Sequence, residues 1–138
     1  MKPITVLLEA SAALAWLLDD SDRGPYYHAF FAVHDLVVIP LWHTEVLNVL
    51  LKRERQKKLS RVKADELIEM VVALDPFTLP EPDSRTLAEL ASLARPHQLS
   101  AYDTLYLEAA INHQLPLATE DKNLRHAARS VGVEVCAV

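Results

Sequence analysis

The chain has 138 residues, an apolar fraction of 51% and a net charge of −5. This length suits a single domain spanning residues 1–138, and the apolar fraction excludes an intrinsically disordered chain. Two glycines are too few for a glycine-rich phosphate loop, and one cysteine excludes an intramolecular disulfide and a cysteine-based metal site. The apolar run near the N-terminus is too short for a secretion signal or a membrane span, so we expect no membrane association and a cytoplasmic protein.

Apolar runs that favour strands alternate along the chain with segments of helical periodicity. Residues 4–8 form a continuous apolar run, which is typical of a strand buried on both faces. Further strands are expected at 36–39, 77–79, 116–119 and 133–136. Helices are expected at 12–18, 26–34, 41–57, 61–74, 84–95, 101–114 and 121–131, with Ser11, Ser60, Asp83 and Ser100 as N-caps. This alternation predicts an α/β fold with a mostly parallel central sheet covered on both faces.

Four acidic residues stand where the pattern predicts an apolar strand end or a packed helix face. They are Glu9, Glu45, Asp103 and Asp121. In a parallel sheet, strand ends and helix N-termini meet at one edge, where ligands bind. Two carboxylates about 5 Å apart repel by roughly 3 kcal/mol at an effective dielectric constant of 20, and a divalent cation would remove that repulsion. A ligand set made only of carboxylates favours Mg²⁺ or Mn²⁺.

Each acid also has a purely structural interpretation. Glu9 can be a charged residue that begins a loop, and Glu45 can pair with a basic residue such as Arg53. Asp103 can cap its own helix together with Ser100. Spacing alone does not separate Asp121 from the neighbouring acid Glu120. The four positions together carry the interpretation as a site.

Basic residues are unevenly distributed. Seven of the 14 lie between residues 52 and 63, and a smaller group beginning at residue 122 shares one helical face. Such groups are compatible either with solvated helix surfaces or with contacts to an RNA backbone. The candidate RNA-binding residues are Arg53, Lys57, Lys58, Lys122 and Arg125.

Four ordered motifs, covering nearly the whole chain, resemble those of PIN domains, at a length typical of the VapC-like toxins of type II toxin–antitoxin systems. The motifs are Glu9-Ala-Ser11, Glu45-Val-Leu-Asn48, Tyr102-Asp103-Thr and Thr119-Glu-Asp121. The resemblance implies a PIN-like three-layer α/β/α fold and a Mg²⁺- or Mn²⁺-dependent endoribonuclease that hydrolyses phosphodiester bonds in RNA. It also implies a homodimer controlled by a VapB-type antitoxin.

The same resemblance assigns roles to individual residues. Glu9, Asp103 and Asp121 would be metal ligands, and Glu45 would complete the site directly or through a water. The Thr-x-Asp pattern selects Asp121 over Glu120. Ser11, Asn48 and Thr119 would position the ligands or the substrate.

Glu9 departs from the family pattern, which has aspartate at this position. One extra methylene moves the carboxylate by about 1.5 Å, whereas Mg²⁺ requires near-octahedral geometry at about 2.1 Å. An alternative is therefore a catalytically weakened or inactive PIN-like module that binds RNA or protein. A phosphotransfer receiver domain is disfavoured, because receivers have an acidic pair after the first strand and a lysine after the last.

Aromatic residues are concentrated near the N-terminus. Trp16, Tyr26, Tyr27 and Phe30 lie within fifteen residues of one another. Core packing is the favoured explanation, and a groove for a second copy or an antitoxin is the alternative.

Overall fold

A four-stranded parallel sheet forms the centre of the computed structural model, which describes residues 4–18 and 22–136. The strands are β1 (Thr5–Leu8), β2 (Asp35–Val38), β3 (Phe77–Thr78) and β4 (Leu117–Ala118), in the order β3-β2-β1-β4. In β1, Val6, Leu7 and Leu8 are at most 1% exposed. The prediction of a first strand buried on both faces is therefore confirmed.

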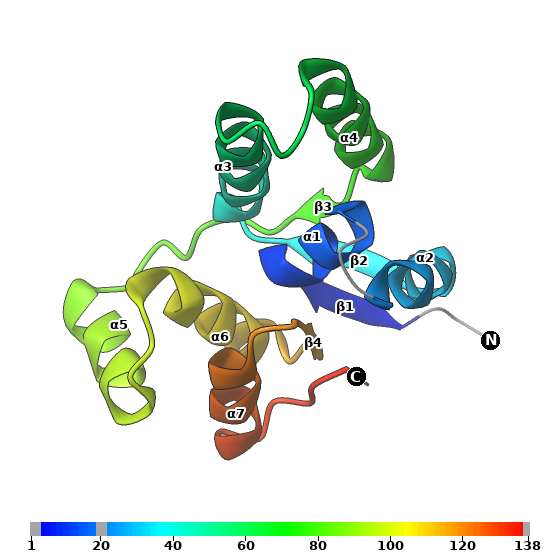
Figure 1. The fold of residues 1–138 in the computed structure, drawn as a ribbon. Helices are drawn as coiled ribbons and strands as arrows, with labels where there is room; N and C mark the ends of the chain where they lie inside the picture. Colours follow the sequence, from blue (N-terminus) through cyan, green and yellow to red (C-terminus); the bar gives the residue numbers. More distant parts are fainter. Residues whose placement is uncertain (1–3, 19–21, 137–138) are drawn as a thin grey trace.

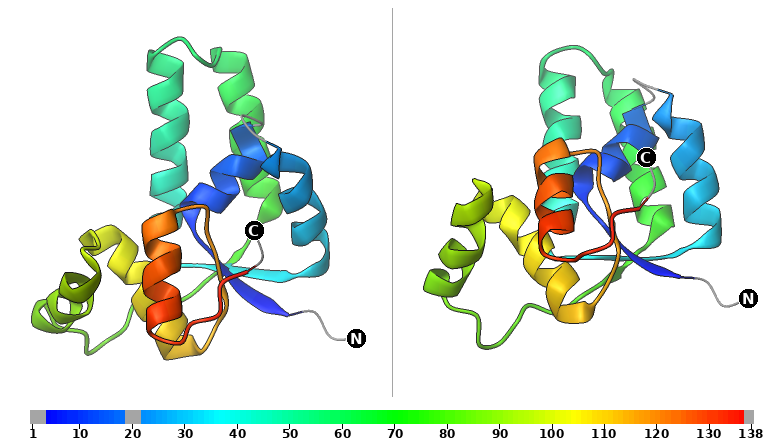
Figure 2. Two further views of the ribbon diagram at one scale, coloured as in Figure 1. Left: turned by 60° about the horizontal axis from the view of Figure 1, so that its bottom comes forward. Right: turned by 90° about the horizontal axis from the view of Figure 1, so that it is seen from below.

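Seven α-helices and one 3₁₀ turn accompany the strands in the described part of the chain. They are α1 (Ala10–Leu18), α2 (Arg23–Val33), α3 (Leu41–Arg55), α4 (Arg61–Leu74), α5 (Leu87–Ala94), η1 (Arg95–His97), α6 (Ala101–His113) and α7 (Lys122–Ser130). Helices α1 to α4 contact one another, and α5, α6 and α7 form a second group (Figure 1). The α3–α4 hairpin extends well beyond the sheet (Figure 2). The predicted α/β class is confirmed, and every strand pair is parallel.

Strand pairing brings separate parts of the sequence to the carboxyl edge of the sheet. Leu8 is paired with Ala118, and the backbone N–H of the next residue, Glu9, donates to the Ala118 carbonyl at 3.0 Å. The β1–α1 turn therefore lies beside the β4–α7 turn. These are the turns that carry the first and fourth motifs.

Two predicted N-caps are wrong, and two are confirmed. Ser11 lies inside α1, because the helix begins at Ala10 and the Ser11 N–H donates to the Glu9 carboxylate at 3.0 Å. The cap of α5 is Thr86 rather than Asp83, because Thr86 forms a reciprocal capping box with Glu89. Ser60 and Ser100 cap α4 and α6 as predicted.

The expected last strand at 133–136 is wrong. It is reduced to an isolated bridge between Val135 and Leu117, supported by backbone hydrogen bonds of Leu117 with Glu134 and Cys136. β4 contains two residues, so it offers little length for a further neighbour to pair with. No helix within residues 4–18 and 22–136 is long and apolar enough to span a membrane.

Candidate functional site

The four predicted acids lie at or near the N-termini of α1, α3, α6 and α7. Glu9 comes directly after β1, Glu45 is in the second turn of α3, Asp103 is in the first turn of α6, and Asp121 is the N-cap of α7. Electrostatic repulsion acts between Glu9 and Glu45, between Glu45 and Asp103, and between Asp103 and Asp121. The fold therefore brings the four carboxylates into one electrostatically coupled series.

Glu9 is the most deeply buried of these acids, at 5% exposure. Its Oε2 atom accepts hydrogen bonds from the Ser11 N–H at 3.0 Å, from the Thr119 hydroxyl at 2.7 Å and from the Ser11 hydroxyl. Burial raises the pKa of Glu9 from its ordinary value of 4.5 to about 6, because desolvation outweighs these bonds and Glu45 adds repulsion. At neutral pH Glu9 is thus a buried anion.

Two hydroxyl groups connect Glu9 to the turn that carries Asp121. The Ser11 Oγ atom accepts from the Glu120 N–H at 2.8 Å, and the Thr119 Oγ1 atom accepts from the Asp121 N–H at 3.0 Å. The two hydroxyl oxygens are 3.2 Å apart. Ser11 and Thr119 therefore contact both Glu9 and the backbone of the turn that carries Asp121, and their positioning role stays a prediction.

Glu45 is half-buried, and its carboxylate is held by a tyrosine that the sequence analysis did not select. The Tyr106 hydroxyl donates to Glu45 Oε1 at 2.6 Å. Desolvation raises the pKa of Glu45, and repulsion from Asp103 adds to it. Spacing offered a signal for Tyr106, because it is three residues after Asp103 and so shares one face of α6.

Asp103 and Asp121 each combine a position at a helix terminus with proximity to another acid. The Asp103 N–H donates to Ser100 Oγ at 3.0 Å, and Asp121 Oδ1 accepts from the Leu124 N–H at 2.8 Å. Desolvation raises the pKa of Asp103, and Asp121 contributes repulsion. The structural and functional interpretations of these residues are therefore compatible.

The neighbour of Asp121, Glu120, has different partners. Its carboxylate accepts from Arg23 Nε at 3.0 Å, from the Tyr27 hydroxyl at 2.8 Å and from Arg125 Nη2 at 3.4 Å. Glu120 is thus engaged with basic and phenolic groups, whereas Asp121 repels Asp103. Of the two acids, Asp121 is the one that adds to the repulsion on Asp103, and its assignment as a metal ligand stays a prediction.

The candidate RNA-binding residues differ in their surroundings. Lys57, Lys58 and Lys122 are exposed, and Arg53 is half-buried beside an open pocket that Ser11 and Glu120 also line. Arg125 donates to the Thr119 carbonyl at 2.7 Å as well as to Glu120, and 14% of its side chain is exposed. The candidate positioning residue Asn48 is exposed on α3.

The acidic series suits a hard cation by its donor chemistry. Carboxylate oxygens are the preferred ligands of Mg²⁺ and Mn²⁺, and the mutual repulsion of the acids would be relieved by positive charge. Within the described ranges, however, no three His, Cys, Asp or Glu side chains stand close enough together to hold a metal ion. The residues are therefore of the chemical type that binds such an ion, but their side chains stand further apart than the ligands of a single bound ion.

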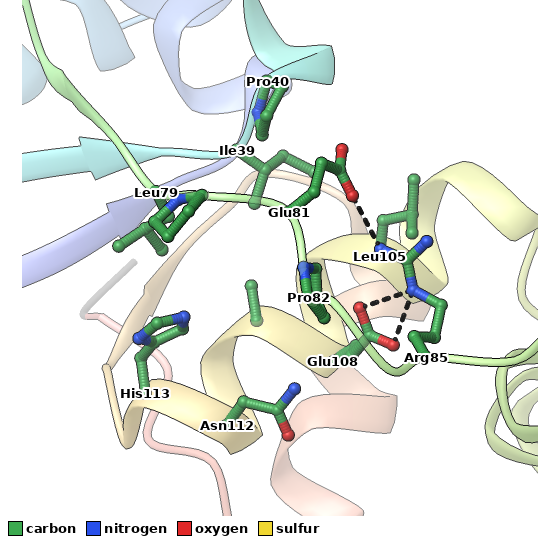
Figure 3. A pocket seen from close by; sticks show the side chains of 12 residues that line it. Ile39, Pro40, Leu79, Glu81, Pro82, Arg85, Leu105, Glu108, Asn112 and His113 are labelled. Carbon is green, nitrogen blue, oxygen red and sulfur yellow. Dashed lines mark hydrogen bonds and ion pairs between the residues drawn. The ribbon is translucent and has the colours of Figure 1, made fainter.

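A separate pocket lies between α6 and the segment joining β3 to α5 (Figure 3). Arg85 Nε donates to both carboxylate oxygens of Glu108, at 3.0 and 2.9 Å, and its Nη2 donates to Glu81 at 2.9 Å. The cavity volume is about 20 Å³, which is room for about one water. This ion-pair cluster connects the segment to α6 and contains none of the four acids.

Comparison with known proteins adds a family and a fold. The sequence profile described as PIN domain matches residues 6–130. The fold is similar to the crystal structure of PAE2754 from Pyrobaculum aerophilum, with 24% identity and a TM-score of 0.70, over 92% of this chain and 86% of that chain. It is also similar to FitAcB from Neisseria gonorrhoeae, with 20% identity and a TM-score of 0.64, over 96% of each chain. No curated protein matches the sequence.

Proposed function

The chain belongs to the PIN-domain family, and on that premise we propose that it is a Mg²⁺- or Mn²⁺-dependent endoribonuclease of the VapC-like toxin type. PIN domains are typically metal-dependent nucleases. The observation that carries the proposal is the series of repelling carboxylates from Glu9 through Glu45 and Asp103 to Asp121. Carboxylates that repel one another destabilise a folded protein unless a positive charge neutralises them. A bound cation would remove this repulsion and explain why the acids are gathered.

In this proposal the four acids bind the ion in different ways. Glu9, Asp103 and Asp121 would ligate it, and Glu45 would complete the site directly or through a water. A bound Mg²⁺ or Mn²⁺ would supply the activation of water and the charge stabilisation that phosphodiester hydrolysis requires. Ser11 and Thr119 restrain Glu9 Oε2 by hydrogen bonds, which leaves Oε1 as the oxygen with more freedom to ligate.

Exposed basic residues support RNA as the substrate. Lys57 and Lys58 follow the end of α3, and Lys122 begins α7 directly after Asp121. Lys122 lies beside the acids, whereas Lys57 and Lys58 lie at the far end of α3 from Glu45. Together they would hold a phosphate backbone that extends beyond the acidic site, so binding should weaken as salt rises. Replacing Lys57 and Lys58 together with glutamine should weaken RNA binding and reduce its salt dependence.

Regulation by a VapB-type antitoxin, homodimerisation and action in the cytoplasm are part of the same proposal. An apolar surface between α3 and α4 supports a protein partner, because Leu47 is 39% exposed and Val72 is 71% exposed there. The early aromatic residues lend less support, because Tyr27 is 3% exposed and its neighbours pack against the core. Co-expression with its operon neighbours, followed by purification and mass measurement, tests both partners.

The direct test is cleavage of total RNA with Mg²⁺ or Mn²⁺ by the parent protein. EDTA should abolish cleavage, and Asp103→Asn should reduce it to background, because it removes one anionic ligand while conserving shape. Equal cleavage by the parent and Asp103→Asn would mean that the activity belongs to a contaminant, and the proposal would fail.

A second candidate is a PIN-like module with weakened or no catalysis, which binds RNA or protein. The observation that favours it is the engagement of Glu9 Oε2 by three donors, on a side chain one methylene longer than aspartate. Under the nuclease proposal, Glu9→Asp should cleave RNA faster and need less metal, because the shorter carboxylate restores the family geometry. Calorimetric titration separates the candidates: absence of Mn²⁺ binding at millimolar concentration favours the non-catalytic module.

A further inference from the structure

Tyr106 is the largest polar side chain buried next to the acidic series. It lies in α6, is 0% exposed, and is one of the two largest fully buried side chains in the described core. A buried phenol needs partners for its hydroxyl group, and that group can donate one hydrogen bond and accept others. The partners of this hydroxyl therefore indicate the role of Tyr106.

The hydroxyl of Tyr106 connects two of the elements that carry the acids, α6 and α3. It donates to Glu45 Oε1 in α3 at 2.6 Å. The Glu9 carboxylate, which directly precedes α1, lies within electrostatic range of this hydroxyl. Tyr106 itself is on α6, one helical turn after Asp103. Tyr106 thus relates the positions of Glu45 and Asp103, with Glu9 close by.

The contact with Glu45 differs from ordinary core packing. The Glu45 carboxylate is half-buried, so its orientation would otherwise depend on solvent. The Tyr106 hydroxyl fixes this orientation, and its own position is set by a fully buried ring.

We propose that Tyr106 is a positioning residue that holds the Glu45 carboxylate in the orientation needed for cation binding, relative to Glu9 and Asp103. The inference rests on the proposed function, because it assumes that the acids receive a cation. Partners that orient metal ligands typically contribute 10-fold to 100-fold in metal affinity or activity. Tyr106 would act through Glu45 without touching the ion.

The test is the substitution Tyr106→Phe, which keeps the buried ring and removes only the hydroxyl. Calorimetric titration with Mn²⁺ should show an affinity about 10-fold to 100-fold weaker than that of the parent protein. Tyr27→Phe is the matched control, because Tyr27 is also buried and donates to a carboxylate outside the series, Glu120, at 2.8 Å. Mn²⁺ affinity should be unchanged in this control. Equal affinity of Tyr106→Phe and the parent overturns the proposal.

A double substitution separates positioning from a general loss of structure. In the Glu45→Gln background, Tyr106→Phe should change Mn²⁺ affinity by less than about twofold, since the residue through which it acts has already lost its charge. A full additional loss in that background would identify a structural role and overturn the proposal. The thermal unfolding of each variant is also measured in EDTA, so that a loss of stability can be told apart from a loss of Mn²⁺ affinity.

A measurement without substitution of Tyr106 covers the case in which Tyr106→Phe does not fold. In protein labelled with 3-fluorotyrosine, the ¹⁹F resonance of Tyr106 should shift on addition of Mg²⁺, because its hydrogen-bond acceptor changes charge environment. The remaining tyrosines are assigned by substituting each with phenylalanine. An unshifted Tyr106 signal under conditions where calorimetry detects binding overturns the proposal.

These outcomes are distinguishable from failure of the proposed function. A parent protein that binds Mn²⁺ but leaves RNA intact refutes the nuclease, while the affinities still report on Tyr106. A parent protein that binds no Mn²⁺ refutes both proposals together.

Discussion

Replacement of Glu9 by glutamine removes a buried negative charge while conserving the shape of the side chain. Glutamine also retains an oxygen that can accept from Ser11 and Thr119. In the parent protein the pKa of Glu9 is raised from 4.5 to about 6. One pKa unit corresponds to about 1.4 kcal/mol, so the shift of roughly 1.5 units is equivalent to about 2 kcal/mol.

The sign follows from the direction of the shift. The folded protein binds the Glu9 proton more tightly than the unfolded chain does, because its pKa is higher in the fold. The free energy of unfolding therefore contains a favourable contribution below pH 4.5 that is lost as the pH rises through about 6. Glu9→Gln has no such contribution to lose. Relative to the parent, the variant should gain about 2 kcal/mol in stability between pH 4 and pH 7.

Urea unfolding in EDTA at both pH values measures this difference. Glu69→Gln replaces an exposed carboxyl on α4 and is the matched control, for which we expect a change within about 0.5 kcal/mol. A difference between Glu9→Gln and parent that stays constant from pH 4 to pH 7 would falsify the argument that burial of the charged form is costly. Addition of Mn²⁺ should then stabilise the parent more than the variant, since only the parent keeps the charge.

Three further predictions concern the scaffold, and urea unfolding checks all of them. Thr86→Ala should cost about 1 kcal/mol, because it removes the capping box at the start of α5. Leu107→Ala should cost about 2–5 kcal/mol, since Leu107 is 0% exposed, whereas Ile111→Ala on the same helix, at 39% exposure, should cost clearly less; equal losses would contradict this. Arg85→Lys should cost about 1 kcal/mol, because lysine has no second nitrogen to contact Glu81 while it contacts Glu108, and an unchanged stability would show that the double contact is dispensable.

Local patterns in the sequence predicted most of the elements. A continuous apolar run predicted β1, because a strand covered on both faces has no polar side. Ser60 and Ser100 were identified as caps because a cap acts on a backbone N–H only three residues away. The same reasoning predicted Asp83 as a cap and was wrong, because Thr86 caps α5 and forms a capping box with Glu89.

The sequence by itself thus determined the alternation of strands and helices and the positions of four acids, because both depend on side-chain period and on neighbours within a few residues. Only the tertiary structure decided how those acids are related. Strand pairing placed the turn after β1 beside the turn after β4, and distant contacts assigned Glu120 to Arg23 and Tyr27 and left Asp121 facing Asp103. The contact of Tyr106 with Glu45 joins residues 61 positions apart. Periodicity carries no information on such pairs, since their proximity arises from the packing of whole elements.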